Sequence, residues 1–178
     1  RQIDEILTRA RKWEDEAENY RRMLERLKSR ANPELEFALY SALGEIYRSR
    51  LHQPDYAITA FGEAARLKPQ DRRTHEILAQ LFEKEGQEQL DKALEAHRAI
   101  VALAPLSAEV ASSYKAMARL FKKMKALDKA FMVSSVLVAM GWADQEDRDF
   151  FEKNLDPSLP WFKVGLDALR WETQMTSP

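Results

Sequence analysis

Residues Ala57–Pro69 read AITAFGEAARLKP, and this stretch carries the pattern that decides the fold. Small residues recur at three- and four-residue steps around one large aromatic side chain, Phe61, and a proline ends the stretch. That spacing places the small residues and the aromatic ring along one face of an α-helix. The terminal proline cannot continue the helix. The stretch therefore predicts a helix that crosses a neighbouring helix closely, and it contains no catalytic motif.

Helix-ending residues recur at a fixed interval along the chain. Pro33, Pro69 and Pro105 are each 36 residues apart, and one further step reaches Gly141. Each interval breaks once near its middle, and alternating strand patterns are almost absent, which is typical of repeats with two helices each. The predicted helices cover residues 2–29, 34–50, 54–67, 72–84, 88–102, 107–124, 127–140, 145–153 and 161–171.

The first unit combines aromatic, small and proline residues at a spacing that identifies a repeat family. The positions that carry it are Tyr40, Leu43, Gly44, Tyr47, Ala57, Phe61, Ala64 and Pro69. In this spacing the unit resembles the tetratricopeptide (TPR) repeat. Two further units follow in phase, with His97 and Ser134 at the position of the second-helix aromatic residue. The resemblance covers roughly residues 34–140 and implies an all-α, right-handed α-solenoid of antiparallel helix pairs.

The two ends of the chain lie outside the repeat array, so the sequence predicts three parts: a long N-terminal helix (1–30), the TPR-like array (33–141) and C-terminal capping helices (142–178). In the N-terminal helix, apolar residues alternate three- and four-residue steps along a heptad seam. The seam consists of Ile3, Ile6, Ala10, Trp13, Ala17, Tyr20, Leu24 and Leu27. It either covers the first repeat, as half of a degenerate preceding repeat, or forms a coiled coil. The aromatic helix 161–171 either shields the last repeat or offers an apolar patch to a partner.

Composition excludes several classes of function. The net charge of −1 gives no global attraction to nucleic acid or to an anionic membrane, and no apolar run approaches the roughly 20 residues of a membrane span. The absence of cysteine excludes disulfides and cysteine-ligated zinc. We therefore expect neither nucleic-acid binding nor membrane insertion. Because no signal peptide precedes Arg1, a cytoplasmic location is expected, and the chain is interpreted as a piece of a longer protein.

Catalytic motifs are equally lacking. His52, His75 and His97 do not share a helix face at the spacing of metal ligands, and none belongs to a recognisable catalytic motif. The acidic stretch after Gly141 lacks the glycine-centred loop of a calcium site. We expect no enzymatic activity, no cofactor and no metal. A helical-repeat RNA binder would need a repeated basic code, which the sequence does not contain.

Binding remains, and the resemblance to TPR arrays implies where it occurs, because the first helix of each pair lines their concave groove. The candidate contacts to a partner are Glu45, Arg48, Arg73, Glu76, Gln80, Lys115, Arg119, Lys122 and Lys123. Residues 115–129 hold six basic side chains against one acidic one, which would suit an acidic segment or a C-terminal carboxylate of a partner; the alternative is that these lysines form a solvated face. The family's carboxylate clamp is not expected, since Ser41, Glu45 and Ile77 stand at its positions. The alternative is a structural or homo-oligomerisation module that acts through the N-terminal seam or the C-terminal aromatic helix.

Overall fold

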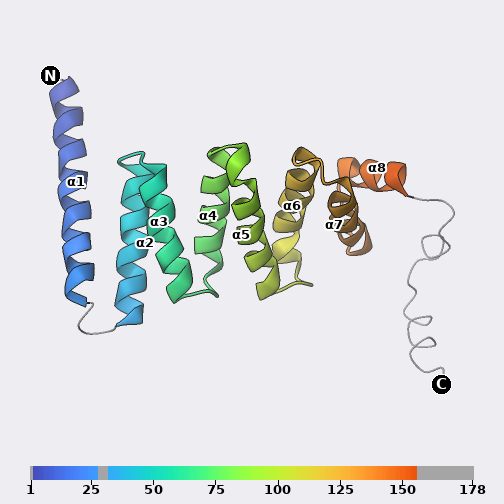
Figure 1. The fold of residues 1–178 in the computed structure, drawn as a ribbon, viewed down its shortest axis with the longest axis horizontal. Helices are drawn as coiled ribbons and strands as arrows, with labels where there is room; N and C mark the ends of the chain where they lie inside the picture. The colour runs from blue at the N-terminus through green and yellow to red at the C-terminus, as the bar shows by residue number, and fades with distance from the viewer. Residues whose placement is uncertain (1, 28–31, 156–178) are drawn as a thin grey trace.

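The computed structural model describes residues 2–27 and 32–155, which form eight α-helices and two short 3-10 turns, η1 and η2, and no strand. Figure 1 shows the helices side by side in one row, each running antiparallel to the next from α1 to α7. Their bounds are α1 Gln2–Leu27, α2 Pro33–Ser49, α3 Pro54–Leu67, α4 Arg72–Lys84, η1 Gln87–Gln89, α5 Leu90–Leu103, η2 Ala108–Val110, α6 Ala111–Lys123, α7 Leu127–Ala139 and α8 Gln145–Asn154.

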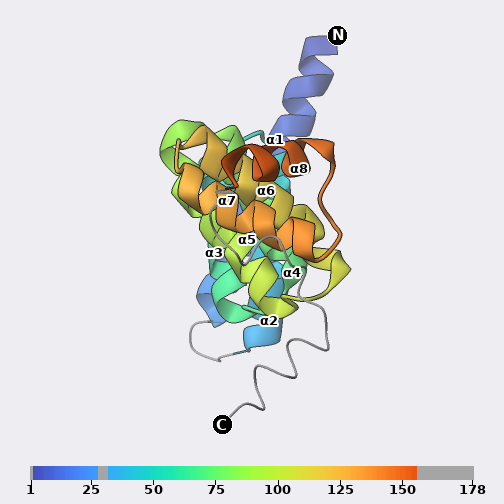
Figure 2. The same cartoon turned by 90° about the vertical axis from the view of Figure 1, so that its right-hand side faces the viewer.

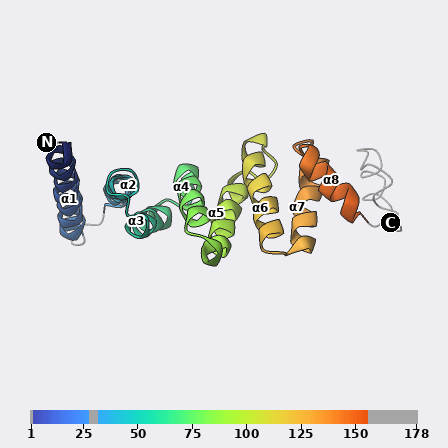
Figure 3. The same ribbon diagram turned by 90° about the horizontal axis from the view of Figure 1, so that it is seen from above.

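The helices pack as successive pairs. α2 packs along α3, α4 along α5 and α6 along α7, while α3 meets α4 and α5 meets α6 between the pairs. Seen from above (Figure 3), the pairs follow one another in a single layer, with α1 before the first pair and α8 after the third. This arrangement confirms the predicted all-α solenoid of antiparallel helix pairs.

The helix ends lie close to the predicted ones, with one clear difference. α6 begins at Ala111 rather than at residue 107, because the preceding residues form the 3-10 turn η2. The side chain of Ser107 accepts the backbone N–H of Glu109 at 3.3 Å and starts that tighter turn. The predicted helix 161–171 lies outside the described residues.

The crossing of α2 and α3 depends on the pairing of a glycine with an aromatic ring. Phe61 is buried, and a Cβ atom added to Gly44 would lie 2.8 Å from two of its ring carbons. The corresponding residues of the second repeat are Ala79 and His97. There a methyl group replaces the hydrogen of glycine while the smaller imidazole replaces the phenyl ring. The larger first residue and the smaller second one offset each other, so the summed volume of the two side chains changes little between the repeats, as close packing requires.

In residues 11–27, the apolar seam of α1 packs against the first repeat of the same chain. Ala17 and Leu24 are buried against the first repeat, and Trp13 and Tyr20 pack on the same cluster. The guanidinium of Arg50, which follows α2, lies 4.8 Å from the centre of the Trp13 ring and adds a cation–π contact. Figure 2 shows that the first turns of α1 extend beyond the rest of the stack. This half of the seam therefore serves to cover the first repeat.

The glycine–aromatic crossing makes Gly44→Ala destabilising. The added methyl group would overlap the ring of Phe61, and overpacking of this kind costs about 1–3 kcal/mol of the free energy of unfolding, measured by urea denaturation. Gly62→Ala is the matched control, because Gly62 is exposed on α3 with nothing within 4 Å of a new Cβ atom. The control should gain about 0.5–1 kcal/mol, since alanine favours a helix interior. Equal effects of the two substitutions would contradict the assigned crossing.

Candidate functional site

Two hollows follow one another along the face formed by the first helices of the pairs. The larger, the α4–α6–α8 hollow, has a volume of about 520 Å³. The smaller, the α2–α4 hollow, has about 410 Å³. The larger is lined by Glu76, Gln80, Glu83, His97, Ser112, Ser113, Lys115, Ala116, Arg119, Lys122, Asp144, Glu146 and Asp147.

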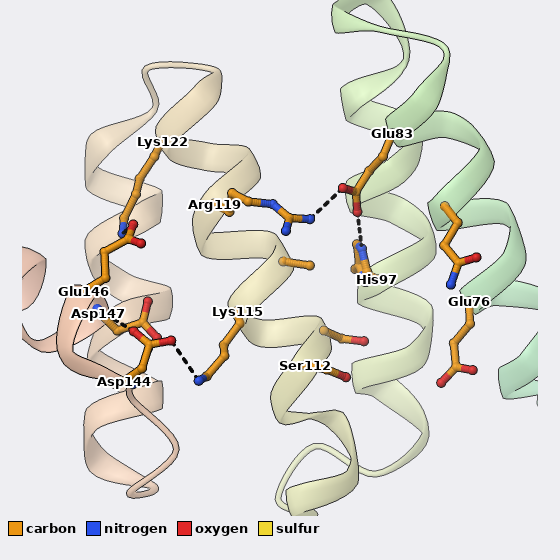
Figure 4. A pocket seen from close by; sticks show the side chains of 13 residues that line it. Glu76, Glu83, His97, Ser112, Lys115, Arg119, Lys122, Asp144, Glu146 and Asp147 are labelled. Atoms are coloured by element: carbon orange, nitrogen blue, oxygen red, sulfur yellow. Dashed lines mark hydrogen bonds and ion pairs between the residues drawn. The ribbon is translucent and has the colours of Figure 1, made fainter.

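Most of the residues predicted from the repeat phase lie in these hollows. The five that line the α4–α6–α8 hollow are Glu76, Gln80, Lys115, Arg119 and Lys122. They come from two helices that are separated in sequence by the whole of α5, and Figure 4 shows residues of both helices around one space. These five candidates of α4 and α6 thus share one surface, and their role in binding stays a prediction.

Of the remaining four candidates, two line the other hollow and two line neither. Glu45 and Arg73 line the α2–α4 hollow. Arg48 and Lys123 are exposed but are not among the lining residues of either hollow. Arg48 instead donates two hydrogen bonds to the Glu45 carboxylate, of 2.8 and 3.0 Å. These hydrogen bonds lower the pKa of the Glu45 carboxyl below its usual value.

Two lysines of α6, Lys115 and Lys122, form ion pairs with acidic side chains at the start of α8. Lys115 donates to Asp144 at 2.9 Å, and Lys122 donates to Glu146 at 3.2 Å. Figure 4 shows Asp144 facing Lys115 across the hollow. Both lysines lie on the side of α6 that the start of α8 approaches, because residues four and seven apart share a helix face. Two of the six basic side chains of residues 115–129 are therefore paired with carboxylates of the same chain.

On the other side of the hollow, one carboxylate joins three helices. Glu83 of α4 accepts a hydrogen bond from Arg119 of α6 at 2.6 Å. Its second oxygen lies 3.1 Å from Nε2 of His97, which is on α5. His97 is 9% exposed, and its buried Nδ1 atom has no hydrogen-bond partner among residues 2–27 and 32–155. His97 thus links Glu83 to the floor of the hollow, a role that goes beyond filling the position of an aromatic residue.

Two carboxyl groups at the start of α8 have opposite pKa shifts. Asp144 caps the helix by accepting the N–H of Asp147 at 3.0 Å, and Asp147 completes a capping box by accepting the N–H of Asp144. The hydrogen bond from Lys115 lowers the pKa of Asp144. Burial raises the pKa of Asp147, and the nearby charge of Asp144 raises it further.

The residues that sequence reasoning missed come mainly from α8. Asp144, Glu146 and Asp147 were not among the predicted contacts, yet they line the same hollow as α4 and α6. A signal for this was present in the spacing of the helix caps. Asp71, Ser107 and Asp144 follow one another at 36 and 37 residues, so α8 has the phase of a first helix and belongs on the groove face.

The described residues contain neither a group of side chains suited to a metal ion nor a helix suited to crossing a membrane. In residues 2–27 and 32–155, no three His, Asp or Glu side chains come together as a metal site would require. None of the helices described there combines the length and apolar character needed to cross a bilayer. The side chains of the α4–α6–α8 hollow offer hydrogen bonds and ion pairs to a ligand.

Comparisons with known proteins agree with this fold. No family model matches the chain, and no curated protein matches it. Among solved structures, a crystal structure of MamA is 17% identical, with 92% of this chain and 90% of that chain covered and a TM-score of 0.51. A second crystal structure of MamA is 14% identical, with coverages of 97% and 94% and a TM-score of 0.54. At these identities the likeness supports the TPR-like helical solenoid over nearly the whole chain.

The pKa of Asp147 gives a pH-dependent prediction. A carboxyl whose pKa is raised on folding lowers stability as pH rises from its ordinary value of 3.8 through the raised value. Asp147→Asn removes the buried charge and keeps a side-chain oxygen for the N–H of Asp144. We therefore expect the melting temperature of the variant, relative to the parent, to rise between pH 3 and pH 7. The exposed Asp149→Asn is the control, and a difference that stayed constant with pH would refute the assignment.

Proposed function

We propose that the chain is a non-catalytic protein–protein interaction scaffold that binds a peptide or a helix of a partner, as part of a larger protein or complex. The observation that carries the proposal is the gathering of five predicted contact residues around the α4–α6–α8 hollow. A concave site of about 520 Å³ lies within the range of small-ligand sites, about 300–1,000 Å³, so it can take several side chains of a bound segment.

The shape of the hollow suits a bound polypeptide. Along α6 its lining includes the small residues Ser112, Ser113 and Ala116, which let another backbone approach. Gln80 on the opposite wall is exposed and presents an amide that can both donate and accept hydrogen bonds. Together these residues provide a floor for a backbone and a polar wall that can fix its register.

The charged side chains that line the hollow indicate which charges a bound segment should carry. Its lining holds five carboxylates and three cations besides His97, and each of the three cations already binds a carboxylate. Exposed ion pairs are worth about 0–1 kcal/mol each, so a partner's carboxylate can replace one at little cost. The excess of lining carboxylates at the same time favours cations on the partner. A segment with both signs of charge therefore fits better than the acidic segment considered from the sequence.

Site-specific photo-crosslinking tests the location of binding. A photoreactive residue replaces Gln80 in the hollow, or Arg98, which is exposed on α5 and does not line the hollow. In native cells we expect the Gln80 variant to crosslink to one continuous segment of a partner, identified by mass spectrometry. The Arg98 variant should not give that product. Equal crosslinking at both positions would contradict a partner site in the hollow.

Binding of the identified segment then tests the hollow directly. Ser112→Trp fills space in the hollow without touching an ion pair, and Arg98→Trp places the same bulk outside it. We expect the first change to weaken affinity at least tenfold in fluorescence anisotropy and the second to leave it unchanged. Reversing the charge of Lys115 or Lys122 is a poorer test, because it would also repel α8. Retained affinity with Ser112→Trp would place binding elsewhere.

A further inference from the structure

The described array ends in an apolar face. Leu127 and Met132 of α7 are 52% and 69% exposed and belong to the few large apolar side chains that are exposed within the described residues. Beside them, Phe131 stacks on Phe151 of α8 with ring centres 5.3 Å apart, and Leu155 is half-buried. We call Leu127, Phe131, Phe151 and Leu155 the C-terminal apolar face, because the two residues from each helix are four apart and so lie on one side of it. An apolar surface at the end of a repeat array marks a place where something else packs.

The preceding repeat shows what covers such a face. By the repeat phase, Leu127 and Phe131 correspond to Leu90 and Leu94 of α5. Those two leucines are only 1% and 3% exposed, because they lie in a cluster with residues of α6 and α7. At the other end of the array, within residues 11–27 of α1, the exposed side chains are polar, among them Arg11, Lys12, Asp15, Asn19 and Arg22. The two ends thus differ, and the C-terminal one has the chemistry of a covered surface.

α8 behaves as the first helix of a further pair. Its cap, Asp144, is in phase with Asp71 and Ser107, which start α4 and η2. The residue three positions after each cap is buried in all three cases, and for α8 this residue is Asp147. A first helix in this fold packs along a second helix that follows it in sequence. The described residues contain no second helix after α8.

We propose that residues 161–171 supply that second helix and cover the C-terminal apolar face, so that the chain contains a fourth helix pair. In the three described pairs the second helix begins 16 to 21 residues after the first, which from Gln145 predicts a start at residues 161–166. Phe162, Leu166 and Leu169 repeat the spacing of Ala130, Ser134 and Leu137, the inner positions of α7.

The length of residues 156–160 and the polarity of residues 161–171 both agree with the proposed second helix. Residues 156–160 can span up to about 17 Å when extended, and packed helices lie about 8–10 Å apart, so the segment reaches the face without strain. On a helix over 161–171, Lys163, Asp167 and Arg170 would form one polar strip, because they are four and three residues apart. That strip would meet water while the apolar residues on the other sides pack against the array.

Hydrogen exchange on the full chain tests the proposal with two neighbouring substitutions. Leu166→Asp places a charge on the inner side of the proposed helix, whereas Asp167→Asn alters its polar strip. We expect Leu166→Asp to speed amide exchange in α8 and the start of α7 at least tenfold and to lower the melting temperature. Asp167→Asn should change neither, and Leu169→Asp should reproduce the effect of Leu166→Asp.

Two results would overturn the proposal. If Leu166→Asp, Leu169→Asp and Asp167→Asn all exchanged like the parent, residues 161–171 would not cover the face. If the parent were a dimer by light scattering and Leu166→Asp turned it into a monomer with α8 still protected, a second copy would be the occupant. A parent that is monomeric, with α8 protected only when Leu166 and Leu169 are intact, supports the fourth pair.

Discussion

The close crossing of two helices within each pair is the constraint on which the rest of this structure depends. A small residue on the first helix lets the second approach, and the side chain opposite must fit the space that remains. At Gly44 there is no room even for a methyl group beside Phe61. The crossing sets the rotation of each helix about its own axis, and that rotation decides which side chains face the neighbouring pair and which face the groove.

The repeat-to-repeat variation follows from the same constraint. Where the glycine of the first repeat becomes Ala79, the aromatic residue becomes His97, and where it becomes Ala118, Ser134 takes that place. Sequence reasoning interpreted His97 as a poor substitute for an aromatic ring. The structure gives it a polar function as well, since the smaller ring brings a nitrogen atom within 3.1 Å of Glu83.

Local patterns predicted the fold well because helix ends and helix faces are local properties. Pro33 and Asn32 start α2, and Pro54 starts α3, where proline and capping preferences predict them. The charge state of the groove could not be predicted in that way. Lys115 and Lys122 meet carboxylates that lie 29 and 24 residues further along the chain, and a count of charges within a window of sequence does not include such partners. The phase of the caps would have placed α8 on the groove, but its acidic side chains were not among the predicted contacts.

The bridges across the α4–α6–α8 hollow have a mechanical consequence. The bridge from Arg119 to Glu83 connects the third pair to the second, and the bridges from Lys115 to Asp144 and from Lys122 to Glu146 connect the third pair to α8. These ion pairs line the hollow, whereas the contacts between neighbouring helices inside the array are mainly apolar. Dissolved salt weakens exposed ion pairs far more than it weakens apolar contacts. The bending stiffness of the array, and with it the width of the groove, should therefore depend on the ionic strength of the surroundings.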